Sequence, residues 1–355
     1  MPDYSVELYD LNNQMVMDIS RFVNISLENT LNDTASLSFT ISLPMFEKLC
    51  ADINVLPRNL IYPQKTEVKL KRNGVYLFGG IISSADSKFE VNNKTLDVKA
   101  DSYLHYFSTR LLNKNYVNTE RSDIAWDAIN TVQSVQYGNL GVTRGSTVNT
   151  FKSDGTFDYQ DVKSIIQRYT WAKPTTYDFE ITPHKVFNTY LRLGSDKPEV
   201  ELVYPQNIVS MTIPRSADSL YNKVIGIGSG MGEERIETTK NALDSQLTYR
   251  IREAKKTFNS VTEMTTLEQN TEGFLYESTE PLVIPDITVE PNALDISSVF
   301  VGDSVKVRAE DSTYNDDLDG MFRIFKLSVS VNENLHEEIK VSFYNPNTGG
   351  GLEDE

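Results

Sequence analysis

Apolar and polar residues alternate with a period of two through most of positions 301–344. This alternation is typical of β-strands that bury one face and expose the other. Within the run 321–331 the apolar phase changes once, at Ile324-Phe325, so we expect a β-bulge or a strong bend there. The polar loop from Asn332 to Glu337 then predicts a hairpin that leads into a further strand.

The same plan occurs earlier in the chain, in residues 66–100. The corresponding segments are Val68-Lys69-Leu70 and Val305-Lys306-Val307 at an offset of 237, Leu77-Phe78 and Met321-Phe322 at 244, and Leu96-Asp97-Val98 and Ile339-Lys340-Val341 at 243. A second series, at a constant offset of 186, matches Val23, Ile25, Leu27, Phe39 and Ile41 with Val209, Met211, Ile213, Ile225 and Ile227, and Leu37 against Lys223 breaks it. The order of elements therefore predicts a duplicated β-barrel or small sandwich, with coincidental strand patterning as the alternative.

The first of the two predicted barrels occupies residues 1–103. Alternating runs predict strands at 6–9, 23–27, 37–41, 67–71, 75–82 and 96–100. Asn73-Gly74 is a strong two-residue hairpin signal, because both positions of such a turn need a positive φ. Apolar residues from Met45 to Cys50 have helical spacing and predict a short helix.

The period changes to that of helices after residue 103. Ser122 is a candidate N-cap for a helix through Val132, and Asp158 is a candidate cap for a helix from Tyr159 to Tyr169. The glycine-containing segment 138–157 between them predicts a surface excursion. Strands are expected at 179–181, 190–193 and 200–203. The capping-box sequence Ser260-Val261-Thr262-Glu263 predicts a third helix, whose stripe is Met264, Leu267, Thr271, Phe274 and Leu275.

These elements predict a mainly β fold with α+β insertions. It contains two similar antiparallel β-barrel domains, the second of them split, and a helix-containing middle domain. The predicted divisions are a first barrel at 1–103, a middle part at 104–204 and 233–297, a second barrel at 205–232 and 298–346, and an acidic flexible tail at 347–355.

Composition excludes several classes of protein. The 355 residues carry a formal charge of −16 and no cluster of Lys and Arg, which argues against specific nucleic-acid binding. The single cysteine, Cys50, excludes an intrachain disulfide framework, and no apolar run is long enough for a membrane span. The first residues do not look like a signal peptide. We therefore expect synthesis in a reducing cytoplasm.

Catalytic and ligand-binding signals are weak throughout. His105, His184 and His336 have no partner at a metal-ligand spacing, so structural roles are expected. The segment 226–230 is rich in glycine but lacks the Lys-Ser/Thr signature of a phosphate loop. The acidic group Asp311, Asp316, Asp317 and Asp319 lacks the ligand order of a calcium loop and is expected to be a solvated hairpin tip. Cys50 is expected to be buried and inert. We predict no catalytic residue, cofactor or metal.

The order of parts resembles the baseplate hub, or tail hub, family of tailed bacteriophages and phage-derived injection machines. The resemblance covers nearly the whole chain and rests on the early alternating strands and on four later segments: Leu77 to Ile82, Tyr103-Leu104, Tyr221 to Val224, and Val301-Gly302-Asp303 through Phe343. None of these motifs is catalytic, and their specificity lies in their order and spacing. In this family two similar barrels per subunit form, in a trimer, a pseudo-sixfold ring that joins a hexameric tail tube to a threefold tip.

The resemblance implies a structural protein of the virion, located at the tail tip or baseplate and surrounding the channel for DNA passage. The implied partners are two further copies of the chain, a hexameric tail-tube or distal tail protein, a separate tip, spike or fibre protein, and a tape-measure protein. A separate tip protein is expected because the chain ends at residue 355 without a fused fibre, lysozyme or peptidase domain. We also expect carboxylates to line the bore and repel DNA phosphates, with an acidic outer surface as the alternative.

The candidate residues of the ring and its barrels are apolar strand positions. They are Val23, Ile25, Phe39, Phe78, Ile81, Leu96, Val98, Val209, Met211, Ile225, Val305, Phe322, Leu327, Val329, Ile339, Val341 and Phe343. An oligomeric β-rich adhesin that binds a receptor or carbohydrate is the second hypothesis, and an enzyme is the third. The duplication fits the ring best, since two similar domains in each of three subunits give six similar positions.

Overall fold

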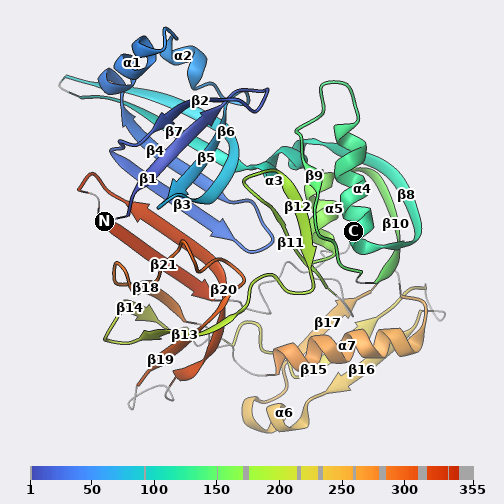
Figure 1. Ribbon diagram of the computed structural model, residues 1–355. Helices are drawn as coiled ribbons and strands as arrows, with labels where there is room; N and C mark the ends of the chain where they lie inside the picture. The colour runs from blue at the N-terminus through green and yellow to red at the C-terminus, as the bar shows by residue number, and fades with distance from the viewer. Residues whose placement is uncertain are drawn as a thin grey trace. The chain divides into compact units, whose positions relative to one another are not determined.

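The computed structural model describes residues 2–91, 93–149, 151–170, 176–213, 217–230, 235–258, 261–279, 285–310, 318–334 and 336–343. The fold is mainly β, as predicted (Figure 1). The chain divides into two compact units. Unit 1 comprises Met1–Thr170, Thr176–Met211 and Ile287–Phe343, and unit 2 comprises Trp171–Thr175, Thr212–Asp286 and Tyr344–Glu355.

Seven strands form the first half of the large sheet in unit 1: β1 (Tyr4–Tyr9), β2 (Met15–Ile19), β3 (Asn24–Thr30), β4 (Ser36–Ser42), β5 (Glu67–Arg72), β6 (Val75–Glu90) and β7 (Asn93–Ser102). Their spatial order is β2-β1-β5-β6-β7-β4-β3, with every pair antiparallel. Between β4 and β5 lie α1 (Leu43–Asp52) and α2 (Pro57–Leu60). Asn73 and Gly74 both have positive φ, at 50° and 79°, which confirms the predicted two-residue turn.

Six strands form the second half: β13 (Asp196–Val203), β14 (Ile208–Thr212), β18 (Asp286–Val289), β19 (Ser304–Ala309), β20 (Leu318–Val331) and β21 (Glu337–Phe343). Their spatial order is β13-β19-β20-β21-β18-β14. The series β5-β6-β7-β4-β3 in the first half thus has the counterpart β19-β20-β21-β18-β14 in the second. The halves differ at the next strand, because β1 is antiparallel to β5 whereas β13 is parallel to β19.

The two central strands carry a β-bulge at the same place. In β6 the register with β7 shifts between Ile82 and Ser84, and in β20 the register with β21 shifts between Ile324 and Lys326. The second shift confirms the bulge that the sequence predicts. The pairings also match Leu96 with Ile339, because these residues face Ser87 and Val329, which lie at equivalent distances from the two bulges. An insertion into a ladder at two equivalent positions is strong evidence of duplication.

Two details of the predicted duplication are wrong. Residues 223–227 form β15 and pair with β16 and β17 in a separate three-stranded sheet of unit 2, so the counterpart of β4 is β18 and the second barrel does not include Ile225. The offset between β6 and β20 is 242 rather than 244. Phe78 is the partner of Leu70, and the partner of the matching residue Val307 is Gly320, not Phe322. Both errors arise because alternating apolar residues match any strand of the same phase.

A middle part of unit 1 lies between the two halves in sequence. It contains α3 (Tyr103–Tyr106), the 3-10 turn Phe107–Thr109, β8 (Leu111–Glu120), α4 (Arg121–Gln133), β9 (Thr143–Arg144), β10 (Lys152–Asp161), α5 (Val162–Arg168), β11 (Asp178–Ile181) and β12 (Val186–Tyr190). Strands β8 and β10 form one antiparallel pair, and β11, β12 and β9 form a small sheet. The buried face of α4 includes Ile124, Ala128, Ile129 and Val132, as predicted.

The predicted starts of the two middle helices are wrong. Glu120 occupies the N-cap of α4, while the Ser122 hydroxyl donates to the carbonyl oxygen of Val148 at 2.6 Å. The second helix begins at Val162, and the Asp161 carboxylate, not Asp158, accepts the backbone N–H of Ser164. Strand pairing of β10 with β8 holds residues 152–161 extended, which also overturns part of the predicted surface excursion.

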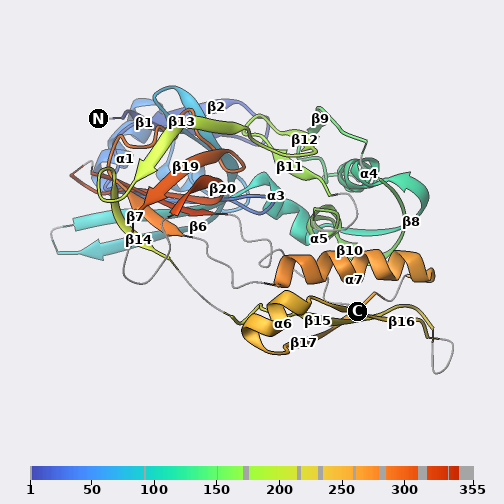
Figure 2. The same cartoon turned by 90° about the horizontal axis from the view of Figure 1, so that it is seen from below.

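The described residues of unit 2 form the sheet β16-β15-β17 and two helices. Their bounds are β15 (Lys223–Ile227), β16 (Glu237–Asn241), α6 (Leu243–Tyr249), β17 (Glu253–Thr257) and α7 (Met264–Ser278). Helix α7 packs across β15 and β16 (Figure 2), burying Leu267, Thr271 and Leu275, whereas Met264 is exposed. Gly226 permits this packing, because a Cβ atom there would lie 1.9 Å from the Thr271 hydroxyl oxygen. Strand β15 ends at Ile227, so the Gly226–Gly230 segment begins as a strand end.

Several predictions fall on residues outside the described ranges. The acidic positions Asp311, Asp316 and Asp317 and the tail 347–355 are among them. So is Ser260 of the capping box, although Glu263, which precedes α7, makes no side-chain cap hydrogen bond. Asp319 lies on β20, where Lys306 and Arg308 form ion pairs with it at 3.6 and 3.7 Å.

Candidate assembly interface

Strands β3 and β20 join the two halves into one continuous sheet (Figure 1). They are antiparallel, and their register runs from Lys326 opposite Thr30 to Val331 opposite Ile25. Beyond the paired strands, the N–H of Leu31 donates to the carbonyl oxygen of Phe325, the bulged residue, at 2.8 Å. The chain thus contains a complete junction between a first and a second half, which we call the β20–β3 junction.

The apolar face of the sheet continues across this junction without a break. Directly opposite residues of successive strands form one buried row: Ile339, Val329, Leu27, Leu37, Ala100 and Ile82. A register slip of one residue would expose the whole row, because side chains alternate between the two faces of a strand. The buried row therefore fixes the register of the two halves relative to each other.

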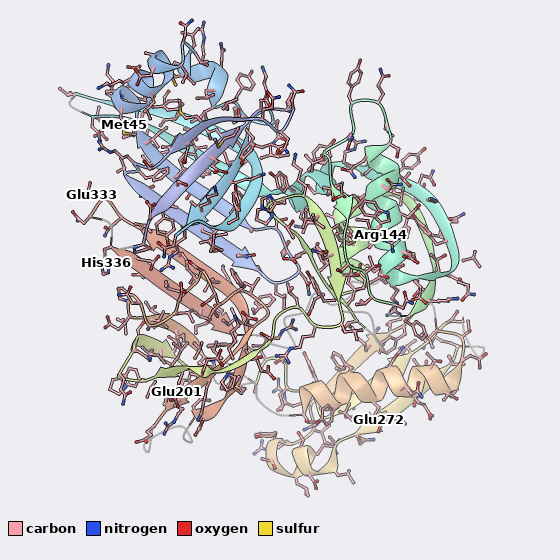
Figure 3. The ribbon with its side chains drawn as sticks, viewed as in Figure 1. Met45, Arg144, Glu201, Glu272, Glu333 and His336 are labelled. Atoms are coloured by element: carbon pink, nitrogen blue, oxygen red, sulfur yellow. The ribbon has the colours of Figure 1, made fainter. Side chains whose placement is uncertain are left out.

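The opposite face carries short polar side chains in the same arrangement. Ser330, Ser26 and Ser38 lie directly opposite one another on β20, β3 and β4. Charges of both signs flank this serine row, and Lys326 on β20 forms an ion pair with Glu28 on β3 at 2.8 Å. Glu333 and His336 lie at the turn between β20 and β21, beyond the end of this face (Figure 3).

A buried ion pair holds the two halves together beside the shared strands. Both guanidinium nitrogens Nε and Nη2 of Arg72, on β5, donate to the carboxylate of Glu337, on β21, at 3.0 Å each. The two side chains are 4% and 3% exposed. The Arg72 Nη1 atom also donates to Asp295 at 2.8 Å, and the Tyr4 hydroxyl donates to Glu337. This two-point geometry orients Arg72 as well as neutralising it.

The electrostatics of this cluster follow from its burial. Burial, together with the hydrogen bond to Glu337, raises the pKa of Tyr4 above its ordinary value, so the hydroxyl stays a donor. Burial disfavours the charge on Arg72, but the adjacent Glu337 carboxylate outweighs it and raises the pKa of Arg72. Breaking such a pair leaves one charge buried without its partner, which is strongly destabilising.

A second polar cluster links both halves to the middle part. The Asp178 carboxylate, on β11, accepts hydrogen bonds from the side chain of Asn32, which follows β3, and from Arg323 on β20. It also accepts the backbone N–H of Leu193 at 2.7 Å. The side-chain oxygen of Asn32 in turn accepts the backbone N–H of Phe179 at 2.9 Å. Three segments far apart in the sequence therefore meet on one carboxylate.

Most of the candidate residues lie in the core of the large sheet. Those that are buried are Ile25, Phe39, Phe78, Leu96, Val98, Val305, Leu327, Val329, Ile339, Val341 and Phe343. Val23, Ile81, Met211, Ile225 and Phe322 are partly exposed, and Ile225 lies in unit 2. Val209 is 55% exposed. The structure brings Ile25, Leu327 and Val329 together at the β20–β3 junction, which the sequence does not identify.

The polar residues of the junction were missed because each looks ordinary in the sequence. Arg72 precedes the Asn73-Gly74 turn, and Glu337 begins a strand after a polar loop, so solvent exposure is the default expectation for both. The two residues are partners of each other and lie 265 residues apart in the chain. The one signal that could have drawn attention to Glu337 is its phase, since it shares the buried face with Ile339 and Val341.

Chemistry outside the junction is sparse in the described ranges. No group of three or more His, Cys, Asp or Glu side chains there is arranged to hold a metal ion. Burial raises the pKa of the Cys50 thiol to about 11, so the thiolate is disfavoured at neutral pH. None of the helices in this part of the chain is long and apolar enough to cross a membrane.

The chain has the fold of phage tail proteins. It matches the 43 kDa tail protein of prophage MuSo2 from Shewanella oneidensis with a TM-score of 0.72 and 11% identity, over 98% of this chain and 99% of the other. A tail protein from Neisseria meningitidis MC58 matches with a TM-score of 0.69 and 13% identity over 96% of each chain. Prophage tail protein gp18 from Listeria monocytogenes EGD-e gives 0.61 and 12%, over 96% of this chain and 95% of that one. No family model and no curated protein sequence matches.

Proposed function

We propose that the chain is a structural tail-hub protein that forms a trimeric ring. Three copies would place six similar half-sheets around a threefold axis, and six similar positions can meet a hexameric tail tube. The observation that carries this proposal is the β20–β3 junction, where two equivalent half-sheets continue one another in register. A second contact of the same kind between copies would carry this arrangement around an axis.

The shared fold supports placement in a tail, because the similar solved structures are two prophage tail proteins and a tail protein from a bacterial strain. The ring would sit at the tail tip or baseplate of a virion, between the tube and a separate tip, spike or fibre protein. Its role would be structural, as the similar folds of the tail proteins suggest.

The polar face of the continuous sheet is the candidate wall of the channel. Its serine row, Ser330, Ser26 and Ser38, presents hydroxyls to a passing polyanion, and Lys99 is the next residue of the row, opposite Ser38. Lys326 is paired with Glu28, which reduces its attraction for phosphates. DNA binding depends on cations that displace its counterions, so such a wall would hold DNA weakly. The expectation of an excess of carboxylates in the bore stays a prediction.

Copy number in purified tails tests the proposal. Quantitative mass spectrometry with isotope-labelled reference peptides would compare the copy number of this chain with that of the tube protein. Under the proposed function, each ring of the tube holds six copies of the tube protein. We expect three copies of this chain per tail, at a terminal position. Six copies per tail, or a chain absent from tails that binds glycans on a screening array, would contradict the hub and support the adhesin hypothesis.

A further inference from the structure

Strand β20 has two successive neighbours along one of its edges. Its first part pairs with β19, from Leu318 to Arg323, and its last part pairs with β3, from Lys326 to Val331. The equivalent strand β6 pairs with β5 from Val75 to Ile81. Beyond its bulge, from Ser84 to Glu90, β6 pairs with β7 on one edge and with no other strand of the described chain on the other. The edge that β3 fills on β20 is open on β6.

Strand β14 has the complementary property. It is the counterpart of β3. The order β7-β4-β3 in the first half corresponds to β21-β18-β14 in the second. Strand β3 pairs with β4 and with β20, whereas β14 pairs with β18 alone among the described strands and ends the sheet. One molecule therefore presents one open edge of each kind, which is the requirement for a head-to-tail contact that can close into a ring.

Apolar side chains are exposed at both edges. Phe89, on the open part of β6, is 69% exposed, whereas its equivalent Val331 at the β20–β3 junction is 6% exposed. Val91, directly after β6, is 101% exposed, and Val209 on β14 is 55% exposed. Unpaired strand edges with apolar side chains favour association with another strand. The difference between Phe89 and Val331 marks a missing neighbour.

We propose that the open part of β6 pairs antiparallel with β14 of a second copy of this chain, and that this contact repeats the β20–β3 junction between subunits. The inference rests on the proposed ring and specifies its subunit contact. Its register follows from the junction. The equivalent bulges give the offset of 242 for β6, and the sequence match of Ile25 with Met211 supplies the offset of 186 for β14, so the pair Val331–Ile25 becomes Phe89–Met211. Val209 of one copy then lies opposite Val91 of the other, so the exposed apolar residues cover one another.

The contact between copies lacks one feature of the junction within the chain. Arg72 and Glu337 correspond to Ala309 and Lys94 at the offsets of 237 and 243, so the buried ion pair has no equivalent there. The subunit contact therefore relies on backbone pairing and on Phe89, Val91, Val209 and Met211. Because the stronger of the two junctions is internal, the chain can fold before the ring forms.

Disulfide trapping tests the pairing in tails assembled from the full set of tail proteins. In a Cys50→Ser background, Lys88→Cys with Thr212→Cys places two thiols directly opposite each other in the proposed register, a separation that a disulfide spans. Lys88→Cys with Met211→Cys is the matched control, because adjacent strand positions point to opposite faces. Ser330→Cys with Ser26→Cys is the equivalent pair at the β20–β3 junction and reports oxidation within one chain.

We expect the Lys88/Thr212 pair to give covalent trimers on non-reducing gels and the Lys88/Met211 pair to give monomers. Trimers from the second pair alone would replace the proposed register with a shifted one and overturn it. Tails that hold three copies of the chain but give no cross-link from either pair would refute the strand pairing and leave the hub intact. A count other than three would refute both.

A surface variant gives a second measure. Phe89→Asp with Val209→Asp places charges at both edges, at positions exposed enough to leave the fold of the chain unchanged. Val117→Asp with Leu111→Asp is the control, since these residues of β8 are 78% and 56% exposed and lie outside both edges. We expect the first variant alone to lose its place in tails while its thermal unfolding stays the same. Full incorporation of the first variant would overturn the proposal.

Discussion

The two half-sheets place equivalent strands by different routes. In the first half, β3 returns directly into β4 through the loop 31–35, whereas in the second half β14 and β18 are separated by most of unit 2. The strand order next to the meander is nevertheless the same. Loop closure becomes only slowly more costly as a connection lengthens, so a long insertion can sit between two paired strands. Sheet position is therefore a better guide to duplication here than spacing along the chain.

The largest expected difference between the two junctions comes from the Arg72–Glu337 ion pair, which is present beside the β20–β3 junction and has no equivalent at the proposed β6–β14 contact. Arg72→Ala leaves Glu337 buried beside Tyr4, and we expect a loss of about 3–5 kcal/mol in the free energy of unfolding. Urea denaturation followed by tryptophan fluorescence measures this loss. Arg72→Met with Glu337→Leu should recover most of it, because both charges are then absent. Equal losses in the single and double variants would show that the pair itself is not the cause.

The buried row distinguishes the β20–β3 junction, where both strands are paired, from the edge of β14, which is open among the described strands of a single chain. Leu27→Ala removes a buried side chain that lies opposite Val329, and we expect it to cost about 2–5 kcal/mol. Ile213, its counterpart at the offset of 186, is partly exposed, so Ile213→Ala should cost less in the isolated chain. Differential scanning calorimetry of both variants tests this order. Equal costs would mean that the edge at β14 is already filled.

The outer strands of the two halves each place a glutamate beside an equivalent cation. Glu7 accepts a hydrogen bond from Lys71, while Glu201 forms an ion pair with Arg308 at 3.2 Å. The side chain of Glu7 is 6% exposed and that of Glu201 is 39% exposed. We expect Glu7→Gln to cost about 2 kcal/mol, as for a hydrogen-bonded charge, and Glu201→Gln to cost about 0–1 kcal/mol.

The first of these effects should depend on pH. Burial alone would raise the pKa of Glu7, but hydrogen bonds from Lys71, Tyr9 and Tyr76 outweigh burial and lower it. A lowered folded-state pKa stabilises the chain above the ordinary value of 4.5, and this stabilisation is lost as the pH falls through the folded-state pKa. The difference in the free energy of unfolding between the parent and Glu7→Gln should therefore decrease below pH 4.5. If this difference stays constant down to the pH of acid denaturation, packing rather than the charge of Glu7 is its cause.

The local elements are largely readable from the sequence. Period-two alternation identifies the strands around Val305, Leu327 and Ile339, and the phase change at Ile324-Phe325 identifies the bulge, because both patterns arise from contacts within a few residues. The Asn73-Gly74 turn is readable for the same reason. The mainly β fold class is confirmed.

The pairing of distant strands is not readable in the same way. Ile225 has the phase of a counterpart to Phe39, yet it belongs to another sheet, because hydrophobic phase does not specify a partner. The contact of Arg72 with Glu337 and the joining of β3 to β20 depend on segments hundreds of residues apart. Polar residues give no signal of burial until those segments meet.

Cryo-electron microscopy of intact tails, reconstructed without imposed symmetry and then with threefold symmetry, tests the central claim most directly. The account predicts three copies of this chain in one ring, with six half-sheets joined alternately by β20–β3 within a chain and by β6–β14 between chains. A ring of three chains joined through other surfaces would contradict the strand pairing. A hexamer of this chain, or a location outside the tail axis, would contradict the account as a whole.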